Sequence, residues 1–99
     1  MGRDALKVLT TGDYNTGIGS KALIANTTGY GQTALGYNAG LTATTGAGNT
    51  FIGNDAGGGT NGVTTGIGNT FVGYQTESAG ANGNYQIVLG FDTLSVSEA

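Results

Sequence analysis

The apolar positions of this chain return in a fixed order. The phrase TTGAGNTFIG at 44–53 recurs as TTGIGNTFVG at 64–73, and three weaker copies begin at residues 10, 27 and 81. Each copy closes on a glycine, and these glycines are spaced 17, 17, 20 and 17 residues apart. The alternation before each glycine predicts a β-strand, and a period of this size predicts a solenoid whose turns stack on one another.

Two columns of the repeat are expected on one face of the strand, and a third column on the other face. The residue before each closing glycine is aliphatic, and the residue two places earlier is threonine in four copies. Because side chains alternate along a strand, these two columns share a face, which we expect to be the core. The aliphatic column is Ile18, Leu35, Ile52, Val72 and Leu89, and the opposite column is Gly17, Ala34, Phe51, Phe71 and Val88.

Apolar residues on both faces of a strand indicate burial on both faces. One chain closes only one interior, so the face with Phe51 and Phe71 predicts self-association, most simply as a closed cyclic oligomer. The 21 glycines, with no proline and no cysteine, indicate tight turns rather than a disulfide scaffold. We therefore expect an all-β fold.

The polar columns indicate how each turn is held. Amides recur in one column, and we expect them to bond to one another along the stack. After each closing glycine, a second segment has a small third residue and a variable polar second residue, which is typical of a half-exposed arc. The third copy is three residues longer within 57–62, and such insertions form loops outside the turn. The amides are Asn15, Gln32, Asn49, Asn69 and Gln86.

The chain divides into three segments. Residues 1–9 contain helix-favouring residues, with Leu6 and Leu9 three apart, and are expected to form a cap or the end of a coiled-coil stalk. Residues 10–94 form the repeat domain of five turns with about 17 residues each, and residues 95–99 form a C-terminal transition.

The charges exclude two classes of partner. The formal net charge is −3, and Arg3, Lys7 and Lys21 are the only cations. Nucleic-acid binding requires a basic stripe, which these residues do not form, and no apolar run reaches the length of a membrane span. We expect neither nucleic acid nor a membrane as a partner.

The chain lacks the usual residues of catalysis. It has no histidine or cysteine, and its carboxylates lie in different repeats or at the termini. The run at 17–22 matches a G-x-G-x-x-A dinucleotide fingerprint, but the same glycines recur in other repeats without a βαβ unit. Asp55 beside Asn54 offers one carboxylate, which is too little for calcium. We expect no enzymatic activity, no cofactor and no metal.

The phrases NTFIGNDAG and NTFVGYQT, separated by TTG, resemble the repeats of trimeric fibre proteins of phage tails and bacterial surfaces. They are similar to the head repeats of trimeric autotransporter adhesins of the YadA type, which are left-handed parallel β-rolls with rungs like NSVAIG. The final GNYQIVLGFDT is similar to the last rung before an endosialidase-type intramolecular chaperone. The resemblance covers 10–94, and this chain departs from it in its longer rung, its threonine in place of valine and the insertion near Gly58.

This resemblance implies a homotrimeric, left-handed parallel β-roll that serves as an extracellular fibre segment, on a virion tail fibre or a bacterial surface. Its trimer interface and core would comprise Ala34, Phe51, Phe71 and Val88 with Ile18, Leu35, Ile52, Val72 and Leu89.

Host attachment would use a cell-surface glycan or a protein receptor. Aromatic and amide side chains at variable outward positions suit sugar stacking and hydroxyl bonding. The candidate ligand-contact residues are Tyr30, Tyr37, Asn38, Asn54, Asp55, Gly58, Gly59, Thr60, Asn61, Tyr74 and Gln75.

Two alternatives remain open. The segment can be a purely structural shaft whose binding tip lies elsewhere on the fibre. It can also be an ice-binding solenoid, because threonine pairs begin at residues 10, 27, 44 and 64. Adjacent residues of a strand face opposite ways, however, so a TT pair does not form the two parallel rows of a T-x-T array.

Overall fold

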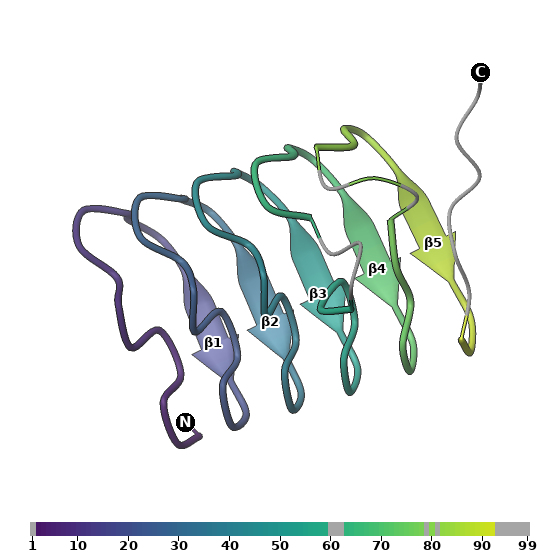
Figure 1. The fold of residues 1–99 in the computed structure, drawn as a ribbon, viewed down its shortest axis with the longest axis horizontal. Coiled ribbons are helices and arrows are strands. Elements are labelled where there is room, and N and C mark those ends of the chain that lie inside the picture. The colour runs from purple at the N-terminus through teal and green to yellow at the C-terminus, as the bar shows by residue number, and fades with distance from the viewer. Residues whose placement is uncertain (1, 60–62, 79, 81, 93–99) are drawn as a thin grey trace.

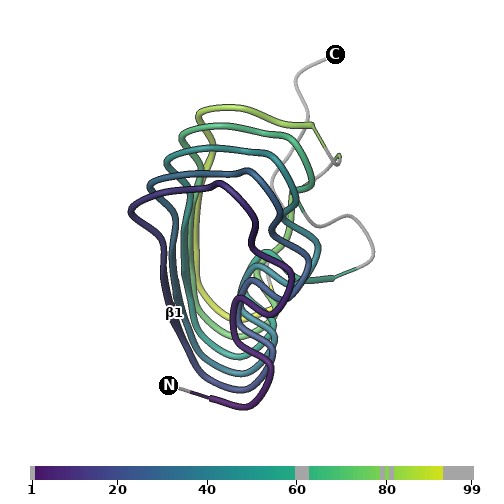
Figure 2. The same cartoon turned by 90° about the vertical axis from the view of Figure 1, so that its left-hand side faces the viewer.

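The computed structural model describes residues 2–59, 63–78, 80 and 82–92, and these residues form an all-β fold without a helix. Five parallel strands pair in chain order and stack as a β-solenoid of about four turns (Figure 1). Figure 2 looks along the stack and shows the turns superimposed, with the strands on one side and looped arms on the other. The predicted all-β solenoid is confirmed. The strands are β1 (Thr16–Ile18), β2 (Thr33–Leu35), β3 (Thr50–Ile52), β4 (Thr70–Val72) and β5 (Ile87–Leu89).

The pairing register of the strands equals the alignment of the repeats. Thr16 pairs with Thr33, and Thr50 pairs with Thr70 even though these two residues are 20 positions apart. The three extra residues of the third copy therefore leave the sheet undisturbed. Hydrogen bonds also join successive turns outside the strands, as from the Gly40 amide to the Ala56 carbonyl (2.9 Å).

The interior lies on the other side of the strands from the one expected. Each strand buries its middle residue, and its two outer residues point away from the core. Leu35 is 47% exposed, whereas its neighbour Ala34 is fully buried, as are Phe51 and Phe71. The prediction that the aliphatic column forms the core of the chain is wrong. The column that contains Phe51 and Phe71 forms it instead.

Complementary side-chain sizes explain why this column lies inside. The middle column changes from glycine to phenylalanine along the stack, and the arc that faces it changes from leucine to glycine. Gly17 lies against Leu6, whose Cγ would be 3.1 Å from a Cβ added to the glycine. Phe51 lies against Gly40 and Gly57, where an added Cβ would collide with the ring. At these two levels, a large residue thus packs against a small residue across the interior.

Residues 2–9 consist of turns and lie over the first complete turn. Gly2 precedes Gly19 by 17 residues, and a Cβ added to Gly2 would collide with the Gly19 carbonyl. The Leu6 amide donates to the Ala22 carbonyl (3.0 Å), and the Leu6 side chain packs against the core. The segment therefore occupies the same position as the arc after each later glycine. The 17-residue spacing between Gly2 and Gly19 is the signal in the sequence for this arrangement. The helix-favouring residues of this segment pointed to a different structure.

The amide column forms a hydrogen-bonded ladder inside the stack. Asn49 Nδ2 donates to Gln32 Oε1 (3.1 Å) and to the Gly66 carbonyl (2.8 Å). Asn49 Oδ1 accepts from the backbone amide of Asn69 (2.9 Å) and from its Nδ2 (3.0 Å). This fully buried side chain thus has partners on both neighbouring turns, which satisfies its polar atoms.

Phe71→Ala is expected to lower the free energy of unfolding by about 3–5 kcal/mol, because a buried ring is replaced by a cavity. Phe71 is fully buried and stacks on Phe51 with ring centroids 5.9 Å apart. Urea unfolding followed by circular dichroism measures the change. Tyr14→Gly is the control, because Tyr14 is 89% exposed and Gly31 occupies the same column. A loss below about 1 kcal/mol for Phe71→Ala would contradict the assigned interior.

Candidate interaction surfaces

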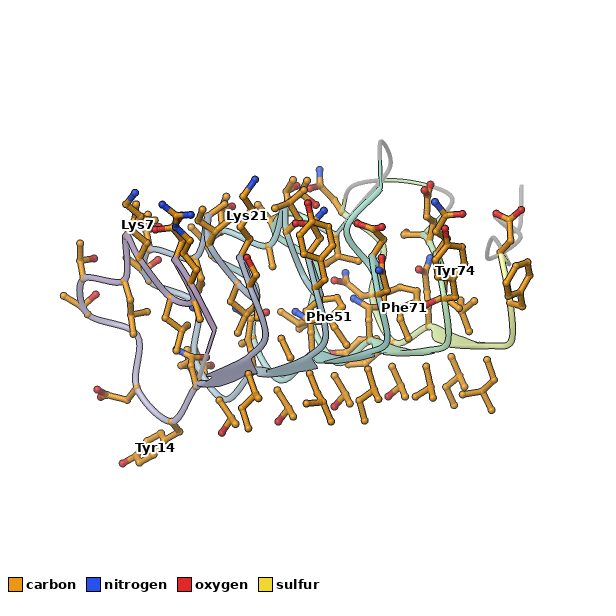
Figure 3. All side chains as sticks on the ribbon, turned by 90° about the horizontal axis from the view of Figure 1, so that it is seen from below. Lys7, Tyr14, Lys21, Phe51, Phe71 and Tyr74 are labelled. Atoms are coloured by element: carbon orange, nitrogen blue, oxygen red, sulfur yellow. The ribbon has the colours of Figure 1, made fainter. Side chains whose placement is uncertain are left out.

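The outer side of the sheet carries two straight rows of side chains, which together we name the sheet face. In-register pairing sets equal positions beside one another, as for Thr33 with Thr50 and Leu35 with Ile52. Figure 3 shows a line of side chains along the outside of the strands. Leu89 is 63% exposed, and neither row contains a charged residue. The rows are Thr16, Thr33, Thr50, Thr70 and Ile87, and Ile18, Leu35, Ile52, Val72 and Leu89.

The turns that follow the strands form a second surface, which we name the aromatic edge. The Asp55 amide donates to the Tyr37 carbonyl (2.8 Å), and the Asp92 amide donates to the Tyr74 carbonyl (2.7 Å). These bonds keep equivalent residues of neighbouring turns aligned. Tyr74 and Phe91 stack with ring centroids 5.1 Å apart. Figure 3 shows Tyr74 away from the row on the sheet face. The edge comprises Ser20, Tyr37, Asn54, Tyr74 and Phe91, and the residue after each: Lys21, Asn38, Asp55, Gln75 and Asp92.

The second column of the aromatic edge has a left-handed backbone. Asn38, Asp55 and Gln75 have φ angles of 57, 58 and 53°. Asparagine and aspartate adopt this conformation at lower cost than most residues. Asn38 Nδ2 donates to Asp55 Oδ1 (2.8 Å), whereas Asn38 Oδ1 is buried without a hydrogen-bond partner in the described part of the chain. The side-chain bond ties two neighbouring turns together at the surface.

The structure brings some of the predicted ligand-contact residues together and separates others. Tyr30 is exposed, but it precedes β2 whereas Tyr37 follows it, so the strand lies between them. Gly58 is buried, and a Cβ added to Gly59 would collide with the Glu77 carboxylate. The aromatic edge gathers Tyr37, Asn38, Asn54, Asp55, Tyr74 and Gln75.

Three further residues complete this comparison. Thr60 and Asn61 lie outside the described residues, as do 93–99, which include the expected C-terminal transition. Phe91 belongs to the aromatic edge but was missed as a candidate, although it holds the same repeat position as Tyr37 and Tyr74.

The first threonine of a consecutive pair belongs to the framework of the fold. Thr10 Oγ1 donates to the Thr27 carbonyl (2.9 Å), and Thr44 Oγ1 donates to the Thr64 carbonyl (3.0 Å). These hydroxyl groups hold one turn to the next. They are not the threonines of the sheet face.

Other kinds of site find no support in the described ranges. No three acidic, histidine or cysteine residues there lie close enough to hold a metal ion, and no pocket is present among them. A search of the same residues finds no helix with the length and apolarity needed to cross a membrane.

No family model, curated protein or solved structure matches this chain. The geometry of the two surfaces is therefore the structural basis for a proposed function.

Asp55→Asn is expected to change the free energy of unfolding by less than about 0.5 kcal/mol, because asparagine accepts a left-handed backbone and keeps an oxygen for Asn38 Nδ2. Asp55→Ala loses both properties, and we expect it to cost about 1–2 kcal/mol. Thermal unfolding of the two variants side by side measures the difference. Equal stability would show that neither the backbone conformation nor the bond to Asn38 matters.

Proposed function

We propose that this chain is a non-enzymatic segment of an extracellular fibre in which three copies associate through the sheet face. The supporting observation is that two uninterrupted rows, one aliphatic and one mainly threonine, stay exposed or half-buried after the chain has closed its own interior. Large contiguous apolar patches are rare on monomers and mark interaction sites. The absence of charge in both rows is typical of the centre of an interface.

A further copy of the same chain suits this face better than an unrelated partner. The rows run straight along the stack and present one side chain per turn, about 4.8 Å apart. An identical face has the same spacing, so its side chains can interdigitate over the full length. The chain is apolar on both faces of its strands, and the side with Leu35, which is 47% exposed, is the interface in this proposal.

Three copies and a left-handed winding are proposed from the resemblance to trimeric adhesin heads. A cyclic trimer with its axis parallel to the stack would cover the sheet face of every copy. Hydrogen bonds between turns run along the length of the stack and would make the fibre stiff. In the proposed role the outward surfaces contact a glycan or protein receptor of a host cell. The alternative is a shaft whose binding tip lies on another part of the fibre.

A matched pair of variants in β2 tests this proposal. We expect light scattering to give three times the mass of the chain. Leu35→Lys should give a folded chain of single mass, because three lysines would meet at the interface. Ala34→Lys should unfold, because Ala34 is fully buried in the interior. Circular dichroism reports folding in each sample. A single-chain mass for the parent protein would exclude the trimer.

Ice binding is the second candidate, and one observation favours it. The sheet face presents a row of threonines, Thr16, Thr33, Thr50 and Thr70, beside an aliphatic row, and both are regular in spacing. If three copies cover this face, we expect no thermal hysteresis in dilute solution. A monomeric protein whose thermal hysteresis disappears in Thr33→Lys would instead establish ice binding.

A further inference from the structure

The first column of the aromatic edge contains a gap between two rings. Tyr37, Tyr74 and Phe91 carry rings in this column, and Asn54 stands between the first two. Tyr74 and Phe91, on neighbouring turns, stack nearly parallel at 18°. The Tyr74 and Phe91 rings therefore stand across the stack, with their faces toward the neighbouring turns, and Tyr37 holds the same position in the repeat. Phe91 covers one face of Tyr74, and the other face is turned toward Asn54.

Asn54 leaves ring faces open because its side chain is smaller than a ring. Tyr37 is 46% exposed and Tyr74 is 42% exposed, although Phe91 stacks on the latter. Backbone bonds from the Asp55 amide to Tyr37 (2.8 Å) and from the Gln75 amide to Asn54 (2.9 Å) keep the three turns in register. The rings of Tyr37 and Tyr74 are thus separated by two turns, about 10 Å at about 4.8 Å per turn.

We propose that this gap, the Asn54 slot, binds one neutral hexopyranose ring of a glycan between Tyr37 and Tyr74. A flat ring in carbon contact with both walls would need walls only about 7–8 Å apart, at about 3.5–4.0 Å for each contact. A pyranose ring is puckered and carries C–H groups on both faces, so it is thicker and suits the wider gap. Its C–H groups pack against the apolar faces of the two rings.

Polar groups around the slot suit hydroxyl groups. The exposed Asn54 amide forms the floor and can both donate and accept. Asp55 offers a carboxylate beside it, with Oδ1 held by Asn38 Nδ2 (2.8 Å). Carboxylate oxygens accept hydrogen bonds from hydroxyl groups.

The charges around the slot select a neutral ligand. Asp55 and Asp92 are the acidic residues of the aromatic edge, and its one cation, Lys21, stands on the first turn. An acidic sugar would meet repulsion from Asp55 without a compensating cation. The slot therefore distinguishes a neutral hexose from a sialic or uronic acid.

This inference rests on the proposed attachment function, to which it adds the class of ligand. The slot is built within one chain and lies on a different surface from the sheet face. Ligand binding and the number of associated copies are therefore separate measurements, and each can fail alone.

Three substitutions within the column test the slot, and each introduces a residue that the column holds elsewhere. Tyr37→Ser copies Ser20, Tyr74→Asn copies Asn54, and Asn54→Tyr copies Tyr37 and fills the slot. Tyr14→Gly is the matched control, because it removes an exposed ring from another column. The probes are methyl glycosides of glucose, galactose and mannose, with methyl glucuronide and uridine for comparison. Titrations of the full chain, followed by NMR chemical shifts and by light scattering, give affinity and mass together.

We expect the full chain to bind at least one neutral glycoside with a dissociation constant of about 1–10 mM, a range suited to one small ring. Tyr37→Ser, Tyr74→Asn and Asn54→Tyr should each weaken binding at least tenfold, and Tyr14→Gly should leave it within twofold. The absence of shifts with all three neutral glycosides would overturn the slot and leave a trimeric shaft intact. Binding of uridine or glucuronide as tightly as the neutral glycosides, or equal loss in Tyr14→Gly, would also overturn it. Binding by a single-chain protein would support the slot and contradict the trimer.

Discussion

In-register parallel pairing is the constraint on which the rest of this structure depends. Each turn sets its residues beside the same positions of the next turn. A residue type that suits or disturbs one position therefore has the same effect wherever the repeat places it. Gly19 illustrates the closeness of this contact, since an added Cβ would lie 2.5 Å from the Gly36 carbonyl oxygen. A buried polar group without a hydrogen-bond partner would likewise lower the stability once in every turn. The amide ladder avoids this cost because Asn49 has partners on both neighbouring turns.

The sequence was sufficient to predict the period, the position of each strand and the columns that share a face. It was not sufficient to predict which face lies inside. Alternation assigns residues to two faces of a strand, but it does not indicate which face the rest of the turn folds over. That information lies in the pairing of Gly17 with Leu6 and of Phe51 with Gly57. These pairs are evident only when the arc is known to fold back across the strand.

For the surfaces, the sequence predicted several of the residues but not how they are arranged. Several residues of the aromatic edge were identified from composition and repeat position, including Tyr37 and Tyr74, but the gap between them was not. The gap requires the orientation of the rings, which the Tyr74–Phe91 stack provides. Gly59 was misleading, because a variable glycine suggests an open loop whereas the Glu77 carboxylate lies against it. The threonine pairs were misleading because the hydroxyl groups of Thr10 and Thr44, the first residues of two pairs, bond to backbone carbonyl groups of the next turn.

The reciprocal sizes within the core make the turns unequal, although their backbones repeat. Gly57 lies against both Phe51 and Phe71, so one arc is fitted to the strands of two successive turns. A turn transplanted to another level would set a phenylalanine against a leucine, or leave a void between a glycine and an alanine. The array can therefore lengthen by duplication only where the copied segment includes a strand together with the arc that matches it. The neighbouring phrases TTGAGNTFIG and TTGIGNTFVG, with Gly57 between them, have the form that such an event would leave.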